Sequence, residues 1–216
     1  MKDKVFKRKL SRARKTAKSW HDGVVYGGGL VMTDQVFGTA KKIEQFYDGP
    51  HKEEVLLAAY LYKAREKNRL NDATKKAMDN GTADNSNIKI AKAFSPIVAR
   101  IVDELLSEPA EDKTQTKEQQ WQEKTKWALD LSREAQAILL AEKLQNFEIS
   151  RDKPNMKKPL QWHMEYYKTR MIMVDALQKA CPALHNECVN VADEGVKSLQ
   201  ARQAALINQN AGNGMV

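Results

Sequence analysis

The sequence has few cysteines and no long apolar run. Only two of its 216 residues are cysteine, Cys181 and Cys188, and they form no disulfide spacing pattern. Small folds held together by disulfides are therefore excluded, and two reduced thiols are expected, as in a cytoplasmic protein. No apolar segment approaches the roughly 20 residues needed to span a membrane, and the N-terminus lacks the apolar block of a secretory signal. We therefore predict a cytoplasmic location and no membrane partner.

Acidic residues are almost absent from residues 1–18, which contain nine lysines and arginines and a single acid, Asp3. These positions carry the whole net charge of +8. An apolar stripe also runs through them, so residues 1–20 are predicted to form an amphipathic helix packed on the domain. Clustered basic side chains neutralise phosphates, which makes nucleic acid one candidate partner of residues 1–18, whereas the alternative is a solvated helix face. The candidate contacts are Lys7, Arg8, Lys9, Arg12, Arg14 and Lys15.

Strand patterns and internal repeats are also absent, and helical periodicity extends along most of the chain. The sequence predicts an all-α bundle of about 7–9 helices. We expect residues 21–208 to form one helical domain and residues 209–216 to form a flexible tail. Helices are predicted from about 34 to 47, 53 to 68, 88 to 108, 121 to 147 (as one or two helices), 160 to 180 and 183 to 209.

The apolar segment from Ser132 to Asn146 carries two polar groups one helical turn apart, Glu142 and Asn146. Positions i and i+4 share a helix face, so both side chains point in the same direction from a buried helix. Burying a carboxylate costs free energy unless a partner compensates it. A metal ion, a cationic side chain or a polar ligand is therefore expected opposite Glu142.

Four segments occur in an order and spacing that carry a family resemblance: Ala13-x-x-x-Ala17-x-x-x-His21-x-Gly23, residues 58–67 (AAYLYKAREK), residues 98–105 (VARIVDEL) and residues 140–147 (LAEKLQNF). They resemble the metal-dependent HD phosphohydrolases, and specifically the hydrolase domain of RelA/SpoT-type (p)ppGpp enzymes. The resemblance implies the HD-domain helical bundle.

The resemblance also implies a role for individual positions. In such enzymes two histidines and two aspartates hold the metal, and a Glu-Asp pair handles water and phosphate. The metal positions correspond here to His21, Asp34, Lys63 and Glu142, since the His-Asp pair is replaced by Tyr62-Lys63. Of the Glu-Asp pair Glu66 remains beside Lys67, and Asn146 is kept, so Glu66 and Asn146 are the remaining catalytic candidates.

Lys63 decides between the interpretations, because an ammonium group cannot ligate a metal and brings positive charge to a cation site. We expect it to pair with Glu142, with Asp34 as a second partner. The favoured interpretation is a degenerate HD protein, or pseudoenzyme, that needs no metal and binds a nucleotide, another anionic ligand or a protein partner. Its ligand-binding candidates are Tyr62, Lys63, Arg65 and Lys67.

Two alternatives stay open. The first is a divergent phosphohydrolase of nucleotides or alarmones, in which His21, Glu66, Glu142 and Asp34 gather Mn²⁺ in an altered geometry. The second is a nucleic-acid-associated protein that acts through its basic N-terminal helix.

Overall fold

The computed structural model describes residues 2–26, 30–63, 90, 93–110, 112–154 and 158–213. This part of the chain is an all-α bundle, as the sequence predicts. Its helices are α1 (Lys2–His21), α2 (Met32–Phe46), α3 (Lys52–Leu61), α7 (Pro96–Leu106), α8 (Lys117–Leu129), α9 (Arg133–Asp152), α10 (Leu160–Ala176) and α11 (Pro182–Asn213). Two short strands, β1 (Val25–Tyr26) and β2 (Leu30–Val31), pair antiparallel between α1 and α2.

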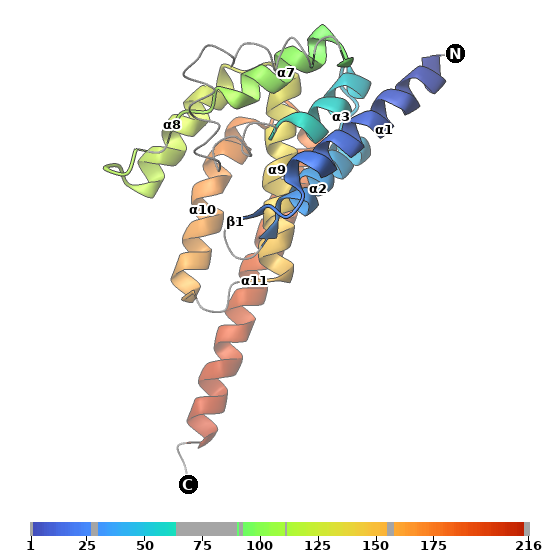
Figure 1. Ribbon diagram of the computed structural model, residues 1–216. Coiled ribbons are helices and arrows are strands. Elements are labelled where there is room, and N and C mark those ends of the chain that lie inside the picture. Colours follow the sequence, from blue (N-terminus) through green and yellow to red (C-terminus); the bar gives the residue numbers. More distant parts are fainter. Residues whose placement is uncertain are drawn as a thin grey trace.

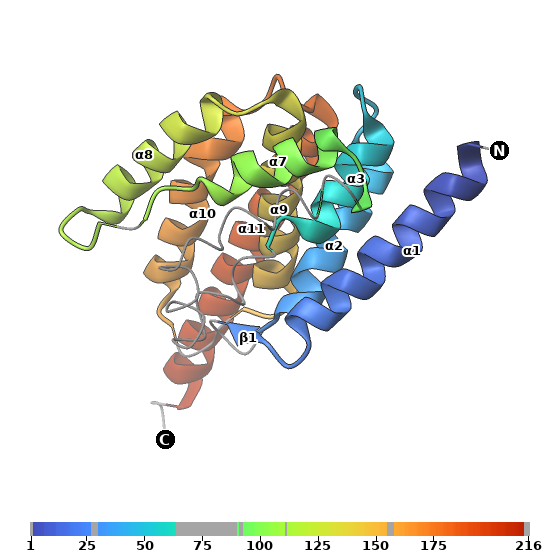
Figure 2. The same cartoon turned by 45° about the horizontal axis from the view of Figure 1, so that its top comes forward.

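Helix α9 lies at the centre of the bundle (Figure 1). It packs against α2 on one side and against α11 on another, and its residues from Ala135 to Leu144 are almost all buried. Helix α1 packs along α3 and α2, while α8 packs on α10 (Figures 1 and 2). Since a buried helix presents every face to protein, a polar residue in the middle of α9 must find its partners on neighbouring helices.

Side-chain caps fix the starts of three helices. The Ser95 hydroxyl accepts from the Val98 amide at the start of α7, and the Ser132 hydroxyl accepts from the Ala135 amide at the start of α9. Helix α8 begins with a capping box between Thr116 and Gln119. Because a cap satisfies an amide that has no partner inside its helix, Ser132 separates α9 from α8 within the segment predicted as one or two helices.

Several helix boundaries differ from the sequence prediction; α7 begins at Pro96 instead of near residue 88, and α9 extends to Asp152 instead of ending near residue 147. Helix α3 ends at Leu61, and Tyr62 and Lys63 form a turn, whereas the predicted helix continued to about Asn68. Helix α11 extends to Asn213 instead of ending near residue 209. None of the helices in the described ranges has the length and apolarity needed to cross a membrane.

The close packing of α10 and α11 gives a first testable prediction. Replacing Gly195 by alanine should lower the free energy of unfolding by about 1–3 kcal/mol, since the new Cβ would overlap the ring and hydroxyl of the buried Tyr167. At an open helix position the same change would be stabilising. Urea unfolding followed by circular dichroism measures the change. The exposed Gln200 on the same helix is the control, and its alanine variant should keep wild-type stability. A Gly195→Ala variant as stable as wild type would contradict this packing.

Candidate functional site

Glu142 and Asn146 lie on one face of α9, one turn apart, and Gln35 of α2 joins them. The Gln35 Nε2 group donates to Glu142 Oε1 at 3.1 Å and to Asn146 Oδ1 at 3.0 Å. Glu142 is buried, with an exposed fraction of 8%, and Gln35 is buried at 2%. Because Glu142 and Asn146 lie one turn apart, both side chains reach the same amide group of Gln35. These two hydrogen bonds connect α9 to α2.

The structure places Gln35 at the position for which the sequence favoured Asp34. Asp34 is exposed on α2, whereas Gln35, one residue later, faces α9. Adjacent residues of an α-helix differ by about 100° in direction, so an error of one residue moves a side chain from the core to solvent. The predicted contact between Lys63 and Asp34 was therefore wrong. The residue of α2 that reaches the site is Gln35, whose amide donates to Glu142.

Two lysines cover the Glu142 carboxylate. Lys63, in the turn after α3, places its Nζ atom 3.0 Å from Glu142 Oε1, so the predicted Lys63–Glu142 ion pair is present. Lys143, the next residue of α9, places its Nζ atom 3.6 Å from Glu142 Oε2. The Lys63 side chain is 15% exposed and that of Glu142 is 10% exposed, so the pair is largely shielded from water. Both oxygens of the carboxylate thus have cationic partners.

These contacts determine how the two groups ionise. Burial opposes the charge of Glu142, but the positive charges of Lys143 and Lys63 and their hydrogen bonds outweigh it and lower the pKa of Glu142 to about 2. Burial lowers the pKa of Lys143, and the charges of Lys63 and Arg170 act in the same direction against the attraction of Glu142 and Glu108. Glu142 is therefore a carboxylate at neutral pH.

The ring of Trp121, on α8, contacts the cationic groups of Lys143 and Arg170 next to this ion pair. The Nζ atom of Lys143 lies 5.1 Å from the centroid of its ring, and the guanidinium carbon of Arg170 lies 5.0 Å from it. Arg170, on α10, also stacks 3.6 Å from the centroid of the Tyr166 ring. Cations over aromatic faces are stabilised by the ring quadrupole. We call Lys63, Lys143 and Arg170 the basic cluster, which lies beside the Glu142 carboxylate.

Sequence reasoning missed Gln35, Lys143, Arg170 and Trp121. A signal existed for Lys143 alone, since it adjoins Glu142 in the matching segment of residues 140–147. Arg170 and Trp121 lie outside the four matching segments, and only the packing of α8 on α10 brings them together.

The other predicted positions are distributed as follows. His21 is the last residue of α1 and is fully buried. Tyr62 is buried at 4%, and its hydroxyl lies 3.5 Å from Thr39 Oγ1. Arg65, Glu66 and Lys67 lie outside the described residues.

The described side chains do not supply the donor set of the divalent metal that the HD resemblance implies. Such an ion needs several convergent oxygen or nitrogen donors and no competing cation. No three histidine, cysteine, aspartate or glutamate side chains of the described residues come together in this way. Glu142, the one buried carboxylate of the candidate site, has ammonium groups at 3.0 and 3.6 Å instead. This set of side chains does not fit a divalent metal ion, and no step through such an ion is derived.

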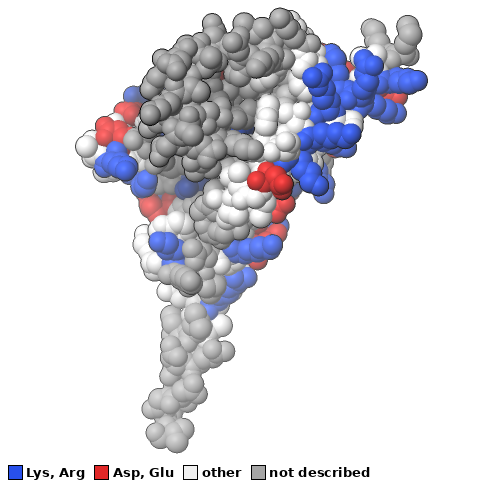
Figure 3. Space-filling view, in the orientation of Figure 1, with Lys and Arg blue, Asp and Glu red and all other residues white. Residues whose placement is uncertain are grey.

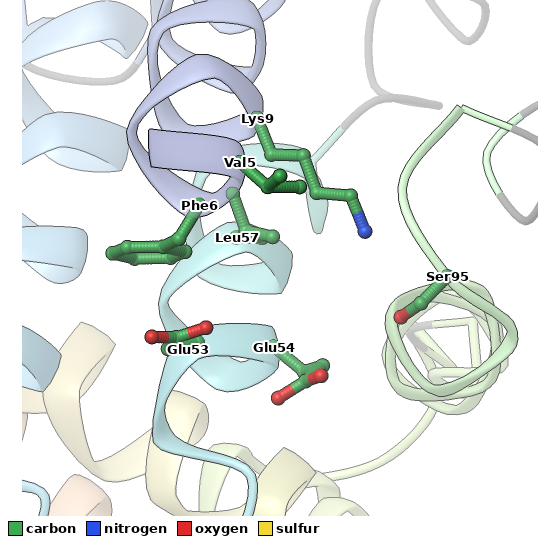
Figure 4. Close-up of a pocket in the computed structure, with 7 residues that line it drawn as sticks. All are labelled: Val5, Phe6, Lys9, Glu53, Glu54, Leu57 and Ser95. Atoms are coloured by element: carbon green, nitrogen blue, oxygen red, sulfur yellow. The ribbon is translucent and has the colours of Figure 1, made fainter. Parts of the chain in front are cut away.

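A separate groove of about 350 Å³ lies between α1, α3 and the start of α7 (Figure 4). Its apolar lining comes from Val5, Phe6 and Leu57, and the carboxylates of Glu53 and Glu54 lie on the α3 side. The groove contains none of the residues of the basic cluster and is a distinct surface feature.

Comparison with known proteins identifies the fold. No protein-family model and no curated protein sequence matches the chain. Among solved structures, the chain is similar to a metazoan ortholog of SpoT, a protein described as hydrolysing ppGpp and as playing a role in starvation responses. The TM-score is 0.62 at 20% sequence identity, over 87% of this chain and 96% of that chain. The bundle therefore has the HD-domain fold that the sequence motifs predicted.

Proposed function

We propose that this chain is an HD-fold protein that binds the phosphates of a nucleotide and does not hydrolyse them with a metal. The observation that carries the proposal is the buried Lys63–Glu142 ion pair. Lys63 occupies the position that corresponds to the aspartate of the His-Asp pair, and its ammonium group supplies the positive charge that a metal would bring to Glu142. An ammonium group cannot act as a Lewis acid on water, so the nucleophile of metal-dependent hydrolysis is not generated.

The gathering of cations supports an anionic ligand. The basic cluster brings Lys63, Lys143 and Arg170 together beside Glu142 and Trp121. The guanidinium of Arg170 is planar and suits bidentate contact with phosphate oxygens. The Trp121 and Tyr166 rings hold Arg170 in place, which reduces the entropy lost when a ligand binds. The fold shared with a protein described as a ppGpp hydrolase makes a guanine nucleotide the first ligand to test.

Titration calorimetry with ppGpp, with and without Mn²⁺, tests this proposal. The wild-type protein should bind ppGpp without turnover, and Arg170→Gln should weaken binding at least tenfold because it removes a cation of the cluster. The same loss is expected for the pair Arg65→Gln and Lys67→Gln, the ligand-binding residues named from the sequence. Lys197→Gln, at an exposed position of α11, is the matched control and should leave the affinity unchanged.

Two results would contradict the proposal. One is turnover of ppGpp that requires Mn²⁺ and disappears in Glu142→Gln. The other is no detectable binding of ppGpp by a folded wild-type protein at millimolar concentration. Metal analysis of the purified protein, with His21→Ala as comparison, separates a resident metal from one added during the assay.

A further inference from the structure

The solvent side of α1 is a continuous row of basic side chains. Figure 3 shows lysine and arginine gathered along this helix. We call the exposed lysines and arginines of α1 the basic ridge; they are Lys4, Lys7, Arg8, Arg12, Arg14, Lys15 and Lys18. Lys4, Arg8, Lys15 and Lys18 follow one another at spacings of three, four or seven residues, so they share one face of the helix. From the first to the last of them the ridge is about 21 Å long, at 1.5 Å per residue.

The ridge is held rigidly by the body of the protein. Ala13 and Ala17 are fully buried beneath it, and Phe6, Leu10 and Trp20 pack against the core. Two basic side chains add anchors of their own. Arg14 Nε donates to the Tyr60 hydroxyl at 3.0 Å, and the Arg12 guanidinium lies 5.7 Å from the centroid of the Phe94 ring. The positions of the charges along α1 are therefore fixed before any partner arrives.

The charges of the ridge are poorly compensated. Lys7 pairs with Asp3, and both side chains are more than 70% exposed, so this pair is weak. Lys4, Arg8, Lys15 and Lys18 form no ion pair with the described residues. Like charges three and four residues apart repel each other along a helix. A polyanion would relieve this repulsion.

We infer that the basic ridge binds the phosphate backbone of double-helical nucleic acid, without reading its sequence. Membrane binding is disfavoured, because an amphipathic helix enters a lipid surface with its apolar face, and here that face is packed against the core. Stacking on unpaired bases is disfavoured as well, since the exposed positions of α1 include no aromatic residue. What the ridge offers is a straight line of cations, which suits phosphates and carries no sequence information.

The groove of Figure 4 limits the contact on one side. Glu53 and Glu54 lie beside α1 there, and their carboxylates repel a polyanion. The contact is therefore confined to the ridge itself. This binding goes beyond the proposed function, because the ridge and the basic cluster share no residue.

Fluorescence anisotropy on a labelled 20-base-pair DNA duplex and on an RNA duplex of the same sequence tests the inference. The protein should bind both, with affinity falling steeply between 50 and 300 mM KCl as counterions are released. Replacing Lys4, Arg8, Lys15 and Lys18 together by glutamine should lower the affinity at least tenfold. It should also make the slope of log K against log salt less negative by about 3–4 units, at about 0.9 per phosphate contact.

The matched control replaces Lys113, Lys126, Lys179 and Lys197, four exposed lysines outside α1, by glutamine. It changes the net charge by the same amount and should retain the wild-type affinity and slope. Equal losses in the two quadruple variants would overturn the inference, since total charge would then be responsible. So would the absence of duplex binding at 50 mM KCl, or binding to phosphatidylserine vesicles without binding to either duplex. Unchanged helicity by circular dichroism shows that the variants are folded.

Discussion

Replacing Lys63 by methionine should lower the free energy of unfolding by about 3 kcal/mol at pH 7, the scale expected when one partner of a buried ion pair is removed. The Lys63 Nζ atom lies 3.0 Å from Glu142 Oε1, and the pair is largely shielded from water. The loss of Lys63 leaves the buried carboxylate with the neutral Gln35 amide and the longer contact to Lys143. Methionine keeps much of the side-chain volume, which separates the charge effect from a cavity. Urea unfolding followed by circular dichroism measures the loss.

Two further variants make this test specific. Lys52→Met removes an ion pair with Asp48 whose side chains are 42% and 90% exposed, and it should cost less than about 1 kcal/mol. In the double variant Lys63→Met with Glu142→Gln, the loss should be smaller than the sum of the losses of the two single variants, because both changes remove the same interaction. If Lys52→Met and Lys63→Met lowered the free energy of unfolding equally, the buried Lys63–Glu142 pair would contribute no more than an exposed ion pair.

The second large effect is on stability in acid. The pKa of Glu142 is about 2 in the folded protein against an ordinary 4.5. The folded state therefore binds this proton more weakly than the unfolded state, so the contribution of Glu142 is complete above about pH 4.5 and is lost as the pH falls toward 2. The difference corresponds to a loss on the order of 3 kcal/mol. Unfolding free energies measured from pH 6 to pH 2.5 should decline accordingly.

Glu142→Gln should be less stable than wild type at pH 7 and should show a flatter decline below pH 4.5. Glutamine cannot compensate the two lysines, yet it does not titrate. Glu44→Gln, at an exposed position of α2, is the matched control and should follow the wild-type curve. If Glu142→Gln also kept the full wild-type decline, other carboxyl groups would be responsible for the acid sensitivity.

The local features of the site were predictable because they depend on short separations along the chain. Glu142 and Asn146 share a face of α9 because they are four residues apart. Lys63 could be placed opposite Glu142 because the matching segments of the HD resemblance fix the order of the helices. The fold itself followed from the same segments together with the helical periodicity, and the structural comparison confirms it.

Other features depend on how helices rotate and pack, and no short pattern encodes that. Gln35 and not Asp34 contacts Glu142 because of the rotation of α2 about its axis, and the packing of α2 against α9 determines that rotation. Helix α3 ends at Leu61 although the predicted helix continued to about Asn68, so Lys63 reaches Glu142 from a turn.

The sequence by itself determined the all-α class, the shared face of Glu142 and Asn146, and the concentration of the net charge in the first 18 residues. The tertiary structure alone decided that Gln35 and not Asp34 faces Glu142, and which further cations join Lys63 beside it. Lys63, Lys143, Arg170 and Trp121 come from four separate parts of the chain, and their electrostatic interactions extend over about 3–6 Å. Such distances between remote residues are set by the packing of whole helices, because each side chain is positioned by the hydrophobic contacts of the helix or turn that carries it.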